Sequence, residues 1–122
     1  MWRASSSVLL ALVMAVAAGL LVHWWYASHP TDWSDFDQMW LGALALLRGQ
    51  NPYLEVPKAF PWPLLYPLPA FLVGLPFVVV PLELARVGFA MLTAGLCTWA
   101  VLRSSAHAWP LQHGRCARTG LE

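Results

Sequence analysis

Charged residues are scarce in this sequence. Lys, Arg, Asp and Glu make up 11% of its 122 residues, against about a quarter in ordinary soluble domains. The net charge of +1 offers no basic surface for a nucleic acid, so we expect no nucleic-acid partner. Hydrophobic residues make up 59%, and the mean hydropathy is +0.57. This composition predicts an all-α integral membrane protein that forms one membrane unit without a second domain.

Motifs for metals, phosphates and nucleophiles are also missing. The only two cysteines, Cys97 and Cys116, lack metal-type spacing, and we expect both to be free thiols. His107 and His113 have no third ligand nearby, and no Cys-x-x-Cys pair, Gly-rich phosphate loop or nucleophilic triad is present. We therefore expect no metal site and no cofactor.

Three apolar blocks, at about 8–26, 64–82 and 84–102, are close to the length that crosses a bilayer. The first contains no charged residue and ends in Trp24, Trp25 and Tyr26, which is typical of an aromatic belt at a membrane exit. A signal peptide is the alternative. The apolar run is longer than a signal-peptide core, and Trp25 stands where a cleavage site needs a small residue. These features favour a retained span.

The second block is interrupted by proline, which predicts a kinked segment buried among other helices. The prolines in it are Pro67, Pro69, Pro76 and Pro81.

Three crossings would put the polar tail, 103–122, outside with its arginines, against the positive-inside rule. Two crossings, with this block re-entrant or interfacial, would put the tail inside. We favour three spans because the block has the length of a crossing. We expect the residues before it, with Pro57, Pro61 and Pro63, to be extended.

Between the first two blocks, apolar residues recur every three or four positions and predict an amphipathic helix at about 35–48. Ser34 and Asp37 have the spacing of a capping box, and Arg48 and Gly49 suit the end of a helix. This helix lies along the membrane surface in one interpretation. In the other it packs beneath neighbouring helices.

Several motifs follow the first block in a characteristic order. They are Asp35-Phe36, the run Leu46-Leu47-Arg48-Gly49-Gln50-Asn51-Pro52-Tyr53, Tyr66-Pro67-Leu68-Pro69, and Pro76-Phe77 followed by Pro81 and Ala85. This order resembles glycosyltransferase family 87, whose members are polyprenol-dependent membrane enzymes of the C-type fold. Leu68 departs from the Tyr-Pro-Pro of the family. The resemblance implies transfer of a hexosyl or pentosyl group from a polyprenyl-phosphate sugar to a lipid-linked or glycan acceptor.

The resemblance also implies that Asp35 is the general base, since a carboxylate within reach can take the proton of an acceptor hydroxyl. The alternative is that Asp35 and Asp37 only stabilise a helix N-terminus, and for Asp37 we prefer this capping role. Asp35-Phe36-Asp37 also matches the Asp-x-Asp pattern of metal-dependent transferases, but no nucleotide-binding unit accompanies it.

Four further residues are candidates for substrate binding. Arg48 and Lys58 are candidates for a lipid phosphate, although both also suit ordinary interfacial anchoring. Tyr53 and Tyr66 are candidates for stacking on sugar or prenyl groups, although aromatic residues are common at a bilayer boundary.

We therefore expect residues 1–102 to form the N-terminal portion of a membrane glycosyltransferase, inactive alone. The expected partners are membrane lipid, the polyprenyl-phosphate sugar donor and the missing C-terminal helices of the enzyme. The expected location is the bacterial plasma membrane, with the loop that carries Asp35 on the outer face. The alternative is a small, non-catalytic membrane interaction or scaffold protein.

Overall fold

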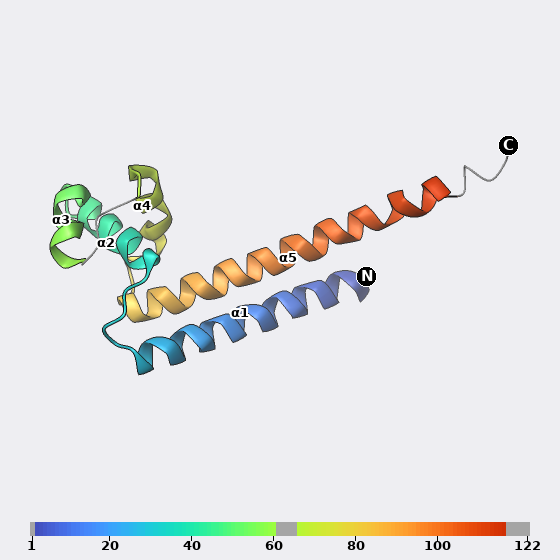
Figure 1. Cartoon of the computed structure of the whole chain (residues 1–122), viewed down its shortest axis with the longest axis horizontal. Helices are drawn as coiled ribbons and strands as arrows, with labels where there is room; N and C mark the ends of the chain where they lie inside the picture. Colours follow the sequence, from blue (N-terminus) through green and yellow to red (C-terminus); the bar gives the residue numbers. More distant parts are fainter. Residues whose placement is uncertain (1, 61–65, 117–122) are drawn as a thin grey trace. The chain divides into compact units, whose positions relative to one another are not determined.

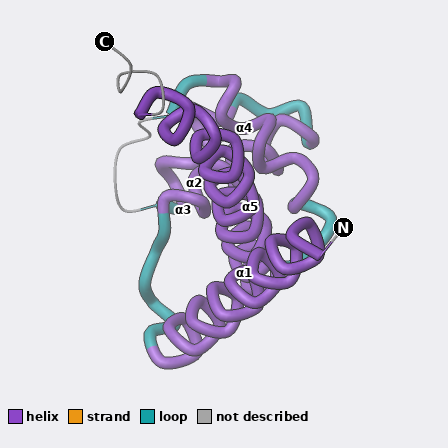
Figure 2. The backbone as a smooth tube through the Cα atoms, turned by 90° about the vertical axis from the view of Figure 1, so that its right-hand side faces the viewer, coloured by secondary structure: helices purple, strands orange, loops and turns teal. Residues whose placement is uncertain are grey.

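The computed structural model describes the backbone of residues 2–60 and 66–116, and the side chains of residues 6–60 and 66–105. All regular structure in these ranges is helical (Figures 1 and 2). The elements are α1 (Trp2–Ser28), α2 (Asp35–Leu47), α3 (Pro52–Ala59), α4 (Leu68–Gly74), the 3-10 helix η1 (Leu75–Phe77) and α5 (Leu82–Cys116). The predicted all-α class is confirmed.

The chain divides into two compact units, and the long helices α1 and α5 contribute to both. The first unit contains residues 1–18 and 91–122, and the second contains residues 19–90. In the first unit, a Cβ built on Gly95 would lie 3.3 Å from the Ala15 Cβ and 3.6 Å from the Ala11 carbonyl oxygen. Small residues therefore bring α1 and α5 into close contact there, as is common between apolar helices.

Two helices are long and apolar enough to cross a membrane: Ser6–Ser28, with mean hydropathy 2.2, and Leu82–Ser105, with 1.5. They contain the expected first and last spans. Only 17% and 11% of their most apolar windows are buried inside the protein, whereas the core helix of a soluble protein is mostly buried. Leu20 and Val101, for example, are each 65% exposed. Apolar exposure on this scale marks a surface that lipid or other helices would cover.

The expected third span at 64–82 is wrong as a continuous helix. After Pro67 the chain forms the seven residues of α4 and the three residues of η1, and a turn leads into α5. Residues 64 and 65 lie outside the described part. Pro69 is tolerated in the first turn of α4, but Pro76 and Pro81 remove N–H donors that a longer helix would need. The interruption at the prolines was predicted correctly, and two helices in the described part have the length of a span, the number in the two-span alternative.

The expected extended conformation before this block is wrong for residues 52–59, which form α3. Pro52 occupies the first helical position, where a missing N–H costs nothing. The Asn51 side chain caps the helix by accepting the Tyr53 N–H at 3.0 Å. Pro57 removes one hydrogen bond near the C-terminal end, so a helix of only eight residues tolerates it. Pro61 and Pro63 lie outside the described residues.

The polar tail was separated from the last span at residue 103, but its backbone continues α5 as far as Cys116. Extending an existing helix avoids the cost of a new nucleus, and Ala, Leu and Arg in this segment have good helix propensity. Residues 117–122 lie outside the described part.

In the second unit, α2 packs against α3, α4 and η1, in line with the alternative that placed it beneath other helices. Ala43 and Phe71 are fully buried in this packing. Gly42 leaves room for the Phe71 ring, because a Cβ at Gly42 would lie 2.4 Å from it. Gly74 lies directly against the backbone of α2, where its absent Cβ would be 2.6 Å from the Met39 carbonyl oxygen.

Replacing Gly74 by Ala is expected to lower the free energy of unfolding by about 1–3 kcal/mol, in the range of overpacked cores. The added methyl would meet backbone, which cannot rotate away as a side chain can. Detergent-denaturation curves of the two proteins measure the difference. Ala70→Gly, on the same helix, is the control for a change in helix propensity. A Gly74→Ala variant as stable as the parent would contradict the close approach of α4 to α2.

Candidate functional site

The second unit contains a buried ion pair between Asp37 of α2 and Arg86 of α5. The Asp37 side chain is fully buried. Its Oδ1 accepts the Arg86 Nε–H at 2.8 Å, and its Oδ2 accepts from Arg86 Nη2 at 2.6 Å. Paired hydrogen bonds of this kind are the strongest contact between Arg and a carboxylate.

The same carboxylate also caps α2. The Ser34 N–H donates to Asp37 Oδ2 at 2.7 Å, and the Ser34 hydroxyl donates to Oδ1 at 2.8 Å. The predicted pairing of Ser34 with Asp37 is therefore confirmed, and the partner Arg86 is an addition that sequence reasoning missed. With four donors around it, Asp37 has little capacity left to bind a metal ion. Asp35-Phe36-Asp37 thus does not present two free carboxylates to one cation.

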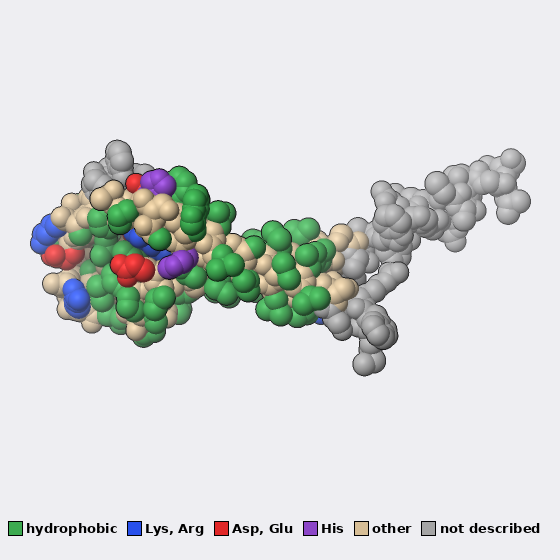
Figure 3. Space-filling view, turned by 90° about the horizontal axis from the view of Figure 1, so that it is seen from below, with side chains coloured by type: hydrophobic (Ala, Val, Ile, Leu, Met, Phe, Trp, Pro, Cys, Tyr) green, Lys and Arg blue, Asp and Glu red, His purple; other side chains and the backbone are tan. Residues whose placement is uncertain are grey.

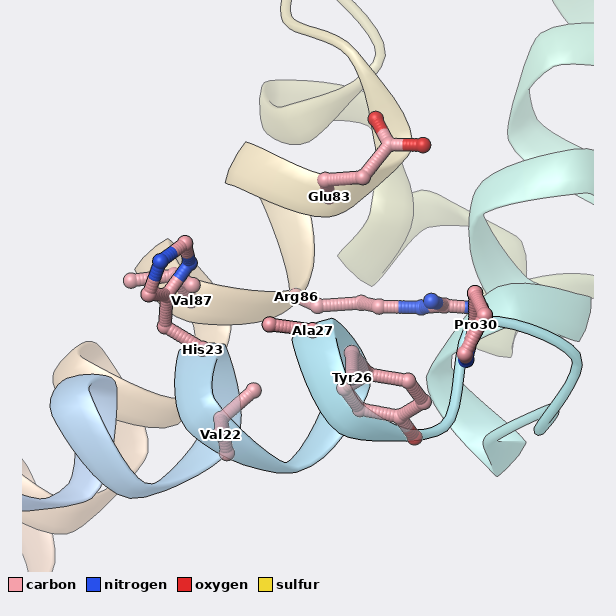
Figure 4. A pocket seen from close by; sticks show the side chains of 8 residues that line it. All are labelled: Val22, His23, Tyr26, Ala27, Pro30, Glu83, Arg86 and Val87. Carbon is pink, nitrogen blue, oxygen red and sulfur yellow. The ribbon is translucent and has the colours of Figure 1, made fainter.

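Arg86 is also held by the segment that precedes α2 in the chain. Its guanidinium lies 4.0 Å from the centre of the Tyr26 ring at the end of α1, and its Nη2 lies 3.3 Å from the Asp32 carbonyl oxygen. A cavity of about 170 Å³ adjoins it, and Figure 4 shows Arg86 extended past Ala27 while Glu83 points away from the guanidinium. A charge inside an apolar block is expected to find a partner, and that rule was the available signal for this pair.

Asp35, two residues before Asp37, is in the opposite situation because it is exposed. The Tyr66 hydroxyl lies near the Asp35 carboxylate, close enough for the carboxylate to affect the pKa of the phenol. Partial burial raises the pKa of Tyr66, and the negative charge and hydrogen bond of Asp35 raise it further. The structure therefore brings together two of the predicted site residues, with Asp35 at the N-terminus of α2 and Tyr66 just before α4.

A buried amide lies one turn further along α2. Gln38 is 3% exposed, and its Oε1 has no hydrogen-bond partner in the part of the chain that the structure describes. Residues three apart on a helix are neighbours, so Gln38 lies next to Asp35. A buried oxygen without a partner calls for an explanation. Gln38 is therefore a further candidate site residue, and sequence reasoning did not identify it.

The raised pKa of Tyr66 leads to a prediction about pH. The folded protein holds the phenolic proton more tightly than the unfolded chain, whose pKa is near 10.0. This contribution to stability is complete below about pH 10 and is lost as the pH rises through the folded pKa. Tyr66→Phe is expected to lose less stability than the parent between about pH 9 and 11. Unfolding curves across that range measure the effect, and Tyr53→Phe is the control. If the free energy of unfolding falls equally with pH in Tyr66→Phe and in the parent, the Asp35–Tyr66 contact is contradicted.

Arg48 and Lys58 also lie together, but at the far end of α2. They line a cavity of about 230 Å³ between α2 and α3. Asp35 and Arg48 are separated by the length of α2, which is about 20 Å at 1.5 Å per residue. Lys58 makes an exposed ion pair with Glu55 at 2.8 Å. The predicted site residues therefore form two groups, one at each end of α2.

Tyr53, the last predicted site residue, belongs to neither group. Its ring is 45% exposed and packs edge-on against Phe71, with ring centres 5.9 Å apart. The Tyr53 ring therefore contributes to the packing between α3 and α4.

One face of the molecule shows acidic and basic side chains gathered mostly over the second unit, while hydrophobic side chains predominate along the long helices (Figure 3).

No protein-family model, curated protein or solved structure matches this chain. The chemistry of the site is therefore argued from its geometry. In the described part of the chain, no three His, Cys, Asp or Glu side chains are grouped so that they could hold a metal ion. What the site offers is an exposed carboxylate with a phenol beside it, at the start of a helix anchored by a buried ion pair.

Proposed function

We propose that Asp35 is the general base of a membrane glycosyltransferase. The reaction transfers a hexosyl or pentosyl group from a polyprenyl-phosphate sugar to a hydroxyl of a lipid-linked or glycan acceptor. The observation that carries the proposal is the contrast between the two acids at the start of α2. Asp37 is buried in an ion pair, whereas Asp35 is exposed with the Tyr66 hydroxyl beside it.

The chemistry needs a group of this kind. A sugar hydroxyl is a poor nucleophile at neutral pH, and a carboxylate within hydrogen-bond reach can take its proton as the new bond forms. The acceptor oxygen attacks the anomeric carbon, and the polyprenyl phosphate leaves with the electron pair of the broken bond. Tyr66 would lie beside the Asp35 carboxylate, and the Asp37–Arg86 pair would hold the helix that carries it.

The donor and acceptor would need more enclosure than the described residues supply. Two cavities in the described part have volumes of about 170 and 230 Å³, and ligand sites for small molecules run from about 300 to 1,000 Å³. We therefore propose that further helices complete the donor cavity around the Asp35 end of α2. In this proposal α1 and α5 lie in the bacterial plasma membrane, with α2 on its outer side.

Complementation tests the proposal in the organism that supplies the gene. Membranes from a strain that lacks the gene are given a radiolabelled polyprenyl-phosphate sugar, and transfer to an endogenous acceptor is measured. Expression of the chain together with the helices that complete it should restore the transfer, and the same co-expression with Asp35→Asn should not. Transfer that is unaffected by deletion of the gene would reject the proposal.

A second candidate function is a membrane scaffold without catalysis. The observation that favours it is the exposure of apolar side chains outside the long helices, with Leu72 58% exposed and Val79 83% exposed. Surfaces of this kind commonly contact another protein or a membrane. A scaffold would capture its partner equally well with Asp35→Asn, whereas Val79→Asp would weaken the capture. Crosslinking in membranes, with both variants, separates the two functions.

A further inference from the structure

The cavity between α2 and α3 combines positive charge with an apolar floor. Leu41 and Leu44 of α2 and Val56 of α3 contribute apolar surface, and Arg48 and Lys58 contribute positive charge. Each cation comes from the end of a different helix. The cavity therefore brings together two residues that were separate candidates in the sequence.

The charge of this cavity is net positive. Glu55 is the acid among its lining residues, so the two cations leave a charge of +1. Glu55 is paired with Lys58, whose side chain is 66% exposed, and an exposed pair of this kind contributes little energy. Lys58 can therefore turn to a ligand at low cost. Arg48 is exposed and makes no ion pair within the described residues.

The proposed glycosyl transfer would not use this cavity for the phosphate of its donor. The phosphate of such a donor is bonded to the sugar carbon that the acceptor attacks, so it must lie within several ångströms of the general base. Arg48 lies about 20 Å from Asp35 along α2. A ligand of this cavity would therefore be a second molecule, and the cavity is independent of the proposed function.

Exposed leucines precede two of the lining residues in the sequence. Leu47 is 64% exposed and precedes Arg48, and Leu54 is 63% exposed and precedes Glu55. Two cations, an amide from Gln50 and neighbouring apolar side chains suit a phosphate ester that is attached to an acyl chain. We propose that the cavity between α2 and α3 binds the phosphate ester of an anionic lipid, and so attaches this end of α2 to a membrane surface.

The test measures lipid binding to the full chain in detergent micelles by native mass spectrometry. Phosphatidylglycerol is titrated, and phosphatidylcholine is the neutral comparison. Arg48→Gln with Lys58→Gln is expected to weaken phosphatidylglycerol binding by about tenfold or more, since two charge-assisted contacts are lost. Glu55→Gln is expected to tighten it, because Lys58 is released and one negative charge is removed. Arg103→Gln, which removes a positive charge near the end of the apolar stretch Leu82–Ser105 of α5, is the matched control and should bind as the parent does.

Competition with glycerol 3-phosphate identifies the source of the phosphate. If it displaces the lipid only at far higher concentration, the ligand is the lipid headgroup with its acyl chains. If it binds as tightly as the lipid, and with the same loss in the Arg48/Lys58 double variant, the site recognises a free phosphate ester. The proposal is overturned if the double variant binds phosphatidylglycerol as Arg103→Gln does, or if phosphatidylcholine binds equally well.

Discussion

Replacing Arg86 by Met is expected to lower the free energy of unfolding by about 3–5 kcal/mol, because the fully buried carboxylate of Asp37 would lose its cation. Met approximates the length of the Arg stem, so most apolar contacts are kept. What is lost is the paired hydrogen bond and the contact with the Tyr26 ring. Denaturation by SDS in mixed micelles, followed by circular dichroism, measures the change.

The control for this experiment is Lys58→Met, which removes the other ion pair in the described part of the chain. Its side chain is 66% exposed, and an exposed pair contributes about 1 kcal/mol or less. Arg86→Met should therefore be several times more damaging than Lys58→Met. Equal effects would mean that the Asp37–Arg86 pair does not hold the second unit together.

Replacing Asp35 by Asn is expected to lower the rate of sugar transfer by about 10²–10⁴-fold, the usual contribution of a general base. Asn keeps the size and can still hydrogen-bond to Tyr66, but it cannot take a proton from the acceptor. Initial rates with a radiolabelled donor in membranes measure the loss.

Glu55→Gln is the matched control, because it removes one acid at the far end of α2, in contact with Lys58. It should leave the transfer rate within about twofold of the parent, as expected for a group outside the reaction. An Asp35→Asn variant that transfers sugar at the parental rate would rule out Asp35 as the base.

The helices with strong local signals could be predicted from the sequence. The apolar run that ends at Trp24 and Trp25 predicted α1, and its length is that of a helix that crosses a bilayer. For α2, the period of apolar residues, the Ser34–Asp37 capping pair and the positive φ of Gly49 at its end agree with one another. Local rules were sufficient there because each one indicated the same segment.

The Pro-rich region shows where those rules compete. Length suggested that 64–82 crosses the membrane, whereas the positions of Pro67, Pro76 and Pro81 allow only the short helices α4 and η1. Around Pro52 and Pro57 the error was in the other direction. The chain at Pro57 was expected to be extended, although Pro52 in the first turn, capped by Asn51, starts a helix that includes Pro57. The position of proline within a turn mattered more than its frequency.

The site depends on contacts between distant residues, which no local pattern encodes. Asp37 and Arg86 are far apart in the sequence, and the capping role of Asp37 gave no sign of a second partner. Tyr66 was a candidate for stacking, but its contact with Asp35 requires α4 to pack on α2. Sequence reasoning could nominate these residues one at a time, and only the packing of the second unit joins them.

The central claim is that the two acids at the start of α2 have opposite roles. The most direct test compares the free energies of unfolding of Asp35→Asn and Asp37→Asn, measured side by side in the same micelles. The account predicts that Asp37→Asn costs about 3 kcal/mol or more, because it leaves Arg86 without its counter-charge. Asp35→Asn should cost about 1 kcal/mol or less, the net value of one exposed hydrogen bond. The reverse order, or equal losses, would contradict the assignment of Asp37 to structure and of Asp35 to chemistry.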